Sequence, residues 1–366
     1  MVAQRERAVT RRLPAEGPIV VGILHPLSWY GDEREAAAAV DALRALDDRL
    51  QVECVEYLEA HDLRTARGNA AGADAARSMA QPLTAEQADL FQRAHAMIAL
   101  DLPYDIGQLA PHLAWVQGVG AGTGQLQSAG LADAGIRLTN AAGTNAVAIA
   151  EFVIGRILEF AKRFAELAHA QREGRWLSAY GSEISQWTVG LVGLGNINAA
   201  VASRLAAFGV TVLGARRNVD ADAVAGVDQV YPISRLNDML ARCDAVVAAV
   251  PETADSIGLF GAKQFAVMKR DALFVNIGRG SAVDEMALIG ALESGHLGGA
   301  ALDVASEEPL PAGHPLWSAP NVAISGHCAA SPAAMFPNLY RLFADNLARL
   351  LRGDSLRNEV DLNRGY

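Results

Sequence analysis

The stretch Val189–Asn198 reads VGLVGLGNIN and decides the fold class of this chain. Its apolar start predicts a short buried strand, and the glycines at 193 and 195 predict a tight turn. The alanine-rich run from Ala199 to Phe208 predicts a helix directly after the turn. This order is typical of a dinucleotide-binding unit, in which Gly195 lets the backbone approach a pyrophosphate at the helix N-terminus. The alternative is an ordinary strand-to-helix turn, because a Gly-x-Gly pair alone is weak evidence.

The residues after this turn indicate which dinucleotide is bound. Asn198 stands where the pattern usually has its third glycine, and Asn196 and Ile197 begin the helix. The next strand ends at Arg216, Arg217 and Asn218, where an NAD site usually carries an acidic residue. Two guanidinium groups suit a 2′-phosphate, so NADP(H) is the favoured cofactor. NAD(H) stays possible if the arginines are only a solvated basic pair.

Outward from this motif, apolar strands alternate with helices in both directions, which predicts an α/β fold. The first half of the chain contains five predicted strands: Ile19–Leu24, Val52–Tyr57, Ala96–Leu100, Ala114–Val119 and Ile136–Thr139. The second half contains six: Thr188–Val192, Val210–Leu213, Ala245–Val250, Leu273–Ile277, Gly299–Val304 and Val322–Ile324. We therefore predict two doubly wound parallel-sheet domains.

Two long predicted helices set the domain boundaries. One helix from Asn145 to Leu167 joins the two domains, and another from Ala333 to Leu351 returns the chain to the first. The prediction is a Rossmann-type NAD(P)-binding domain at 145–330 inserted into a flavodoxin-like substrate domain at 19–144, which 331–366 completes. Residues 1–18 are predicted to be a flexible tail.

Composition narrows the possible partners. The net charge of −10 disfavours nucleic acid, because binding a phosphate backbone needs clustered Lys and Arg. Only three cysteines occur, without metal-ligand spacing, which favours a reduced cytoplasmic protein that binds no metal. The arginines before Pro18 have no apolar stretch after them, and the run Val147–Phe160 contains charges. We therefore expect neither a secretion signal nor a membrane partner.

Further motifs follow in a fixed order along the second half. Val275–Glu285 reads VNIGRGSAVDE, Gly299–Val304 reads GAALDV shortly before Glu308, and Asn321–His327 reads NVAISGH. With the glycine turn, the PET of Pro251–Thr253 and the NAAG of Asn140–Gly143, they cover most of residues 114–335. On these motifs the chain resembles the D-isomer-specific 2-hydroxyacid dehydrogenase family, in its glyoxylate/hydroxypyruvate reductase-like, NADP-preferring branch.

The resemblance implies a hydride transfer between NADP(H) and carbon 2 of a small 2-oxo or 2-hydroxy acid. Such a reaction needs a cation that binds the carboxylate and polarises the carbonyl, and an acid that protonates the developing alkoxide. Arg279 suits the first task. By resemblance, His327 is the proton donor and acceptor, and Glu308 fixes its tautomer and favours its charged form. Family members commonly form homodimers, which we also expect here.

The resemblance also assigns binding residues. A cradle of backbone amides for the substrate carboxylate maps onto Ala121 and Gly122, within a glycine-rich turn. Asp303 matches a position that contacts the nicotinamide carboxamide, although an Asp at a strand end is as often a helix cap. The predicted cofactor-binding residues are Gly193, Gly195, Asn196, Ile197, Arg216, Arg217, Asn218, Val250, Pro251, Thr253, Ile277, Gly278, Asp303 and His327.

Three positions depart from the family pattern. Asn198 replaces a glycine, Gly124 replaces a usual aspartate, and Gly326 replaces a usual proline. Glu308 argues against the formate dehydrogenase branch, which carries glutamine there. A second functional class stays open: corepressor-like proteins that sense NAD(P) share this fold and can keep the same triad, so the fold alone does not decide function.

Overall fold

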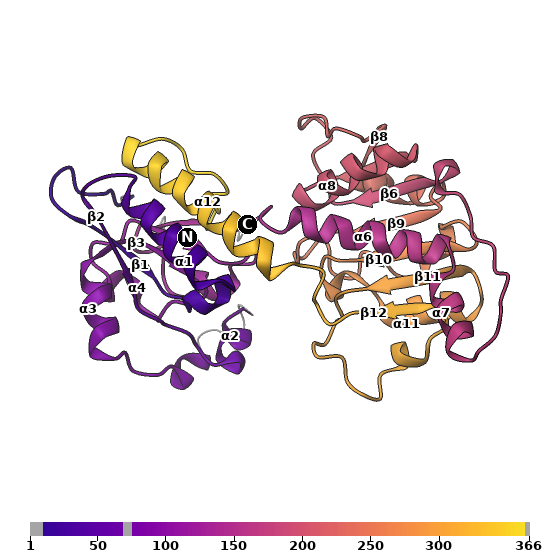
Figure 1. Ribbon diagram of the computed structural model, residues 1–366, viewed down its shortest axis with the longest axis horizontal. Coiled ribbons are helices and arrows are strands. Elements are labelled where there is room, and N and C mark those ends of the chain that lie inside the picture. The colour runs from indigo at the N-terminus through magenta and orange to yellow at the C-terminus, as the bar shows by residue number, and fades with distance from the viewer. Residues whose placement is uncertain (1–9, 69–74, 363–366) are drawn as a thin grey trace, which may run out of the picture. The chain divides into compact units, whose positions relative to one another are not determined.

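The computed structural model describes residues 10–68 and 75–362, which form two compact units (Figure 1). Unit 1 consists of Met1–Thr144 and Pro332–Tyr366, and unit 2 consists of Asn145–Ser331. Each unit is built on one parallel sheet with helices on both faces. The predicted fold class, two doubly wound α/β domains, is confirmed.

Unit 1 contains a five-stranded sheet in the order β2-β1-β3-β4-β5. Its strands are β1 (Ile19–Ile23), β2 (Leu50–Cys54), β3 (Ala94–Ala99), β4 (Trp115–Gly118) and β5 (Arg137–Thr139). Its helices are α1 (Glu33–Arg44), α2 (His61–Gly68), α3 (Ala85–Arg93), α4 (Ile106–Leu109), α5 (Gly124–Gln127) and α12 (Pro332–Arg352). The strands pair in parallel throughout, as their continuous apolar runs predicted.

The two faces of this sheet are covered by different helices. Helices α1 and α12 pack on one face, where the Phe343 ring stacks on Trp115 with 4.9 Å between ring centroids. Helix α3 packs on the other face through Leu90 and Phe91. The described part of the N-terminal segment lies against this unit, because Arg11 donates to the carbonyls of Ala110 (2.8 Å) and Gly107 (3.1 Å).

Unit 2 contains a seven-stranded sheet in the order β12-β11-β10-β9-β6-β7-β8. Its strands are β6 (Thr188–Val192), β7 (Thr211–Arg216), β8 (Gln229–Pro232), β9 (Ala245–Ala248), β10 (Ala272–Asn276), β11 (Leu297–Leu302) and β12 (Val322–Ile324). The prediction of six strands missed β8. This edge strand reads QVYP, and its two polar or imino residues hide the apolar pattern that marks a strand.

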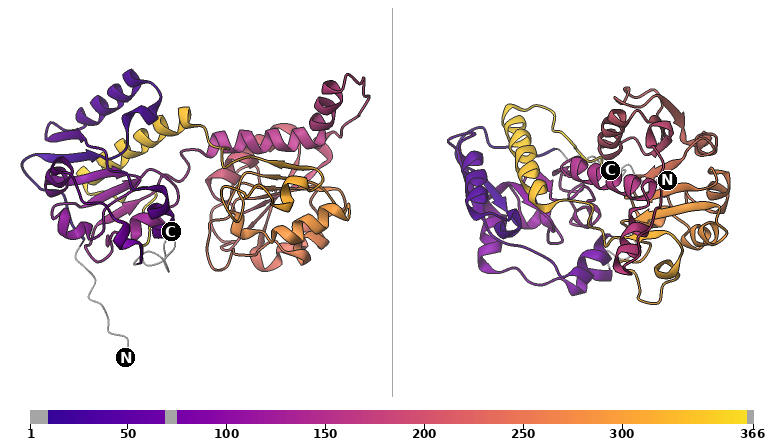
Figure 2. Two further views of the ribbon diagram at one scale, coloured as in Figure 1. Left: turned by 90° about the horizontal axis from the view of Figure 1, so that it is seen from below. Right: turned by 45° about the vertical axis from the view of Figure 1, so that its right-hand side comes forward.

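The helices of unit 2 also lie on both faces of its sheet (Figure 2). They are α6 (Ala146–Ala161), α7 (Phe164–Arg172), α8 (Asn196–Leu205), α9 (Leu236–Leu240), α10 (Ala262–Val267) and α11 (Glu285–Glu293). Helices α6 and α8 cover one face, and α9, α10 and α11 cover the other. Among the described residues, no helix is long and apolar enough to cross a membrane.

The prediction of one helix over Asn145–Leu167 was wrong. Arg163 adopts a left-handed backbone conformation with φ of 58° and separates α6 from α7. The reason lies in a crossing segment, because the N–H of Ser182 donates to the Ala161 carbonyl at 2.8 Å. Helix α7 and the chain after it consequently extend away from the rest of unit 2 (Figure 2).

Candidate active site

The predicted cofactor and catalytic residues of unit 2 all lie at or just after the carboxyl ends of its strands. Arg216 is the last residue of β7. Residues 193–198 follow β6, 217–218 follow β7, 250–253 follow β9, 277–279 follow β10, 303 and 308 follow β11, and 327 follows β12. The sheet changes its direction of winding at β6, which lies between β7 and β9. Ligands of doubly wound sheets bind outside the carboxyl ends at such a switch point.

The glycine turn after β6 has the geometry that a dinucleotide needs. Gly193 has φ of +86°, and a Cβ atom there would lie 2.7 Å from the Ala249 carbonyl oxygen, so only glycine fits. A Cβ atom on Gly195 would instead meet nothing within 4 Å. Gly195 is the N-cap of α8 and offers no side-chain cap, so the first amides of this helix stay available to an anion. The turn therefore fits a pyrophosphate.

Asn198 explains how the chain manages without the third glycine. Its side chain is fully buried in the first turn of α8. The amide Nδ2 donates to the carbonyl oxygens of Val192 at 3.1 Å and Gly193 at 2.9 Å. The side chain thus ties the helix to the end of β6 and holds the glycine turn in place. Its Oδ1 atom has no hydrogen-bond partner among the described residues.

The basic residues after β7 have different surroundings. Arg216 donates to the carbonyl oxygens of Asp222 (3.0 Å) and Ala221, so its guanidinium group orders the loop that follows the strand. Arg217 is exposed, and its guanidinium lies 3.5 Å from the Asp255 carboxylate. The Asn218 side chain accepts a hydrogen bond from the N–H of Asp220 at 3.1 Å. The two arginines are therefore not equivalent.

The segments after β9 and β10 pack closely against each other. Val250 and Ile277 are buried, and a Cβ atom on Gly278 would lie 2.8 Å from the Val250 carbonyl oxygen. The turn at Pro251–Thr253 is closed by Ser256, whose hydroxyl donates to the Pro251 carbonyl at 2.6 Å. These contacts leave Pro251 exposed at the end of the sheet, beside the loop that carries Arg279.

Asn276, the last residue of β10, shapes the turn that carries Arg279. Its Nδ2 donates to the Arg279 carbonyl at 3.0 Å, and its Oδ1 accepts from the Gly278 N–H at 3.1 Å. The Arg279 guanidinium donates to the Gly278 carbonyl at 2.7 Å and is half-buried. A buried amide side chain thus fixes the backbone on both sides of the predicted substrate-binding arginine.

The next residue joins this turn to the loop that carries Glu308. Gly280 is buried, and a Cβ atom there would overlap the backbone of Ala305 and Ser306. The N–H of Ala305 in turn donates to Glu308 Oε1 at 3.1 Å. The Arg279 turn and the Glu308 loop are therefore in direct backbone contact.

Glu308 and His327 form the predicted acid–base pair. The carboxylate oxygen Oε2 of Glu308 lies 2.8 Å from Nδ1 of His327. Both groups are accessible, with 39% of the Glu308 side chain and 55% of the His327 side chain exposed. A carboxylate at Nδ1 favours the tautomer that carries a proton on Nδ1. Nε2 is left for a ligand.

The loop that carries His327 is held by Asp303. The buried Asp303 carboxylate accepts hydrogen bonds from Ser325 Oγ (2.6 Å), the N–H of Cys328 (3.0 Å) and the N–H of Ala329 (3.0 Å). His327 itself has φ of 53°, a strained conformation for a residue with a side chain. Asp303 thus acts within the protein as a loop clamp, and its contact with a nicotinamide stays a prediction.

The predicted carboxylate cradle lies in unit 1, directly after β4. The Gly120 carbonyl accepts from the N–H of Ala141 at 2.9 Å, while Ala121 and Gly122 are exposed. Neither Ala121 nor Gly122 donates its backbone N–H to another described residue. Two free, adjacent amides in a turn of small residues suit an anionic ligand.

Known proteins resemble both units. Residues 154–329 match the family model described as "D-isomer specific 2-hydroxyacid dehydrogenase, NAD binding domain". A glyoxylate reductase of Thermofilum pendens is 33% identical over 259 residues, which cover 68% of this chain and 75% of that protein. A glyoxylate/hydroxypyruvate reductase B of Citrobacter koseri is 36% identical over 219 residues, 58% of this chain and 67% of that protein.

Solved structures extend this likeness to nearly the whole chain. A D-isomer-specific 2-hydroxyacid dehydrogenase of Xanthobacter autotrophicus, solved with NADPH, covers 96% of this chain and is itself fully covered, with 28% identity and a TM-score of 0.73. An NADPH-dependent glyoxylate/hydroxypyruvate reductase of Sinorhizobium meliloti, solved with NADP, gives the same coverage, 26% identity and a TM-score of 0.70. This chain belongs to the D-isomer-specific 2-hydroxyacid dehydrogenase family. It is an NAD(P)-dependent oxidoreductase of 2-hydroxy and 2-oxo acids.

Two site residues of this dehydrogenase had no role in the sequence-based prediction. The departure at Asn198 predicted no function, and the motif that contains Asn276 predicted no role for this residue. Both are buried amides that hydrogen-bond to backbone groups of ligand-facing turns. A polar residue at the end of an otherwise apolar strand was the available signal for Asn276.

Proposed function

We propose that this dehydrogenase reduces a small 2-oxo acid to the D-2-hydroxy acid with NADPH as the hydride source. The observation that carries the proposal is the 2.8 Å contact between Glu308 and His327, on a loop in backbone contact with the Arg279 turn. This combination supplies a proton donor, its orienting carboxylate and a cation on neighbouring strand ends. NADPH would be held by the Gly193–Gly195 turn and the N-terminus of α8, and it supplies the hydride when bound.

In this mechanism each side chain has a separate task. The Arg279 guanidinium binds the substrate carboxylate and draws electron density from the carbonyl oxygen. His327, charged before the reaction, gives its Nε2 proton to the oxygen as negative charge develops there. Glu308 stays ionised, keeps the ring oriented through Nδ1 and stabilises the charged imidazole. In the oxidative direction neutral His327 is the base.

The cradle of unit 1 adds the second part of substrate binding. We assign the exposed N–H groups of Ala121 and Gly122 to the substrate carboxylate. Backbone amides bind an anion without introducing a titratable group, so this contribution is independent of pH over the working range.

NADP(H) is the proposed cofactor in preference to NAD(H). Arg217 is exposed at the carboxyl end of β7, where a guanidinium group suits a 2′-phosphate. Arg216 orders the same loop through its carbonyl groups. The segment contains no acidic residue at positions 216–218 that would repel the phosphate.

A kinetic screen tests the proposal. Purified protein is mixed with NADPH or NADH and a panel of 2-oxo acids that includes glyoxylate, hydroxypyruvate and pyruvate, and nicotinamide absorbance is followed. We expect turnover of at least one acid, faster with NADPH, and almost none in the matched variant His327→Gln. Tight NADPH binding without turnover of any acid would instead support the corepressor-like alternative, which the enzyme names of the relatives above do not favour.

We further propose that the enzyme is a homodimer formed through unit 2. The segment that extends beyond α6 has three large exposed side chains: Phe164, Trp176 at 98% exposure and Tyr180 at 87%. A cavity of about 670 Å³ lies beside the same segment, between α6 and the amino ends of β10 to β12. Large apolar side chains so exposed mark interaction surfaces, and a second copy offers the same cavity and side chains in return.

The oligomeric state tests this second proposal. Light scattering coupled to size exclusion should give twice the chain mass for the wild type. The double variant Trp176→Ser, Tyr180→Ser should give the mass of one chain, whereas Trp317→Ser, at another exposed tryptophan of unit 2, should not. A wild-type protein that runs as one chain at micromolar concentration would end the proposal. A cytoplasmic location stays a prediction from the cysteine pattern.

A further inference from the structure

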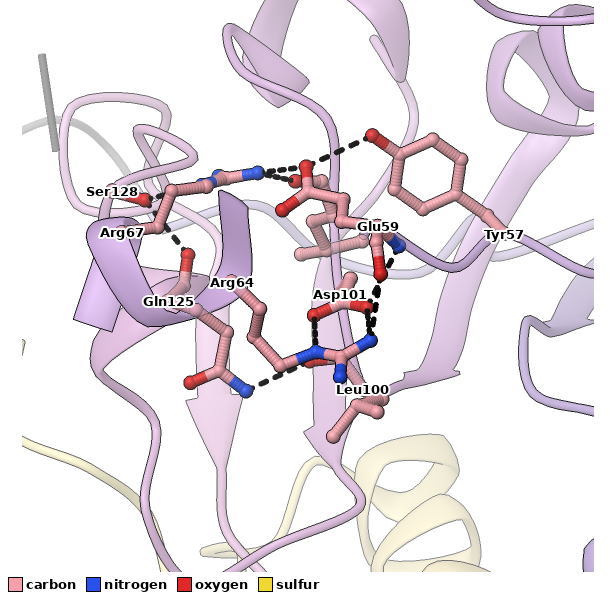
Figure 3. A network of polar contacts seen from close by, with 9 residues as sticks. Tyr57, Glu59, Arg64, Arg67, Leu100, Asp101, Gln125 and Ser128 are labelled. Carbon is pink, nitrogen blue, oxygen red and sulfur yellow. Dashed lines mark hydrogen bonds and ion pairs between the residues drawn. The ribbon is translucent and has the colours of Figure 1, made fainter. Parts of the chain in front are cut away.

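Two ion pairs with mostly buried side chains lie close together in unit 1 (Figure 3). In the first, Glu59 pairs with Arg67, and in the second, Asp101 pairs with Arg64 through contacts of 2.7 and 2.6 Å. The side chains of Arg67 and Asp101 are 0% exposed. The Glu59 side chain is 3% exposed and that of Arg64 is 27% exposed, so three of the four charged groups are buried and Arg64 lies at the edge of the network.

The pairs connect helix α2 to the carboxyl end of the sheet. Arg64 and Arg67 belong to α2, Glu59 precedes it and Asp101 follows β3. Asp101 Oδ2 also accepts from the N–H of Glu59 at 3.0 Å, which joins the two pairs. Arg67 additionally donates to the carbonyl of Leu102 at 2.5 Å. Helix α2 is therefore fixed to the segment after β3 by its charged side chains (Figure 3).

The same network reaches helix α5, which begins directly after the cradle. Arg67 Nε donates to Ser128 Oγ at 2.8 Å, and Ser128 Oγ donates to the Gln125 carbonyl at 2.8 Å. The Gln125 side chain returns to the sheet, where Nε2 donates to the Leu100 carbonyl at 2.9 Å. An unbroken series of hydrogen bonds thus joins Glu59 to the residue that lies three positions after Gly122 (Figure 3).

Gly124 supplies independent evidence that α2 and the cradle are fitted to each other. A Cβ atom at this position would lie 3.0 Å from the Gly68 carbonyl oxygen and 3.3 Å from Gly68 Cα, at the end of α2. A side chain at position 124 would therefore require the end of α2 to give by a few tenths of an ångström. Glycine at 124 suits this close backbone contact.

The network is not expected to add much to the stability of the folded state. Burying charges costs solvation free energy that their attraction only partly returns, and an apolar cluster of the same volume is often as stable. Two of its buried atoms, Glu59 Oε2 and Arg67 Nη2, also lack a hydrogen-bond partner among the described residues. Directional bonds from charged groups do, however, fix the relative position of the segments that they join.

We propose that this network positions the cradle for the substrate carboxylate. The pairs hold α2 against α5, and α5 holds the turn in the conformation that presents the N–H groups of Ala121 and Gly122. Glu59, Arg64, Arg67 and Asp101 are thus positioning residues, and none of them touches the reacting atoms. This inference rests on the proposed function and predicts that the network controls affinity for the acid, independently of cofactor affinity.

The test uses variants that weaken the network while keeping its shape. Glu59→Gln removes one buried charge at nearly constant volume, and Ser128→Ala cuts only the link between Arg67 and α5. For each full-length variant we would measure KM and kcat for the acid that the wild type turns over fastest, and the NADPH dissociation constant by fluorescence. We expect KM for the acid to rise at least tenfold in Glu59→Gln and several-fold in Ser128→Ala, with NADPH affinity within twofold of the wild type.

The matched control is Glu359→Gln, which breaks the ion pair with Arg137 at 2.7 Å at the amino end of β5. Among the described residues the Glu359 carboxylate bonds only to Arg137, which does not belong to the network. If the network had only a structural role, the variants would contain less active enzyme, so kcat would fall while KM for the acid stayed unchanged. That result in both Glu59→Gln and Ser128→Ala would overturn the inference. If Glu59→Gln does not fold, Ser128→Ala decides. Wild-type protein that reduces no acid would instead defeat the proposed function.

Discussion

The two units of this dehydrogenase use charged side chains in opposite ways. Unit 2 keeps its acid–base pair accessible, with His327 and Glu308 both partly exposed, and holds the surrounding turns with buried amides such as Asn276. Unit 1 buries the Glu59–Arg67 pair and offers the backbone amides of Ala121 and Gly122 at its candidate ligand surface. The difference teaches that a group must stay accessible to exchange protons with a ligand, whereas a group that only positions others can be buried and paired.

The largest expected effect comes from the accessible pair of unit 2. His327→Ala removes the proton donor, and general acid catalysis by a positioned side chain contributes about 10²- to 10⁴-fold to a rate. We expect kcat to fall in this range, measured at saturating NADPH and acid. His112→Ala, at an exposed histidine of unit 1, should leave kcat unchanged. Equal activity in both variants would remove the proposed distinction between the units.

The next effect concerns the two arginines after β7. Arg217→Ser should lower kcat/KM for NADPH by about thirtyfold, equivalent to about 2 kcal/mol of a charge-assisted contact, and leave that for NADH nearly unchanged. Arg216→Asp should favour NADH more strongly, because it also places a negative charge at the site and releases the carbonyl groups of the loop. An unchanged preference in both variants would mean that the arginines are only surface charge.

A smaller effect is expected at the buried amide of the glycine turn. Asn198→Ala removes two hydrogen bonds, each with a net contribution of about 1 kcal/mol. We expect the NADPH dissociation constant to rise about tenfold and the melting temperature to fall by several degrees, while KM for the acid stays constant. A rise in KM for the acid with an unchanged NADPH dissociation constant would contradict this expectation. It would show that Asn198 supports binding of the acid and not of NADPH.

The smallest effect is expected for a partly exposed ion pair in unit 1. Hydrogen bonds from Arg49 lower the pKa of Asp47 to about 2. A lowered pKa stabilises the folded state above the ordinary Asp pKa, and this stabilisation is lost as the pH falls towards 2. Asp47→Asn should therefore lower the urea midpoint slightly at pH 7, and the difference should vanish near pH 2. A large effect at pH 7 would contradict the expectation that exposed pairs contribute little.

Local patterns predicted most of the strands and the motifs of unit 2, because glycine turns and apolar runs act within about ten residues. β8 and the break at Arg163 were missed, since the first is a mixed edge strand and the second depends on a crossing segment near Ser182. The charged network of unit 1 was not predicted at all. Its members lie between Tyr57 and Ser128 and meet only after folding, so no local spacing marks them.

Gly280 gives the molecule a mechanical property that neither of its neighbours has alone. Because its α-carbon is pressed against the Ala305–Ser306 backbone, the turn with Arg279 and the loop with Glu308 have to move as one body. Even a methyl group at position 280 would overlap this backbone. It would push the turn that carries Arg279 away from the loop that carries Glu308. A residue without a side chain thus maintains the relative position of the substrate-binding arginine and the carboxylate that orients the proton donor.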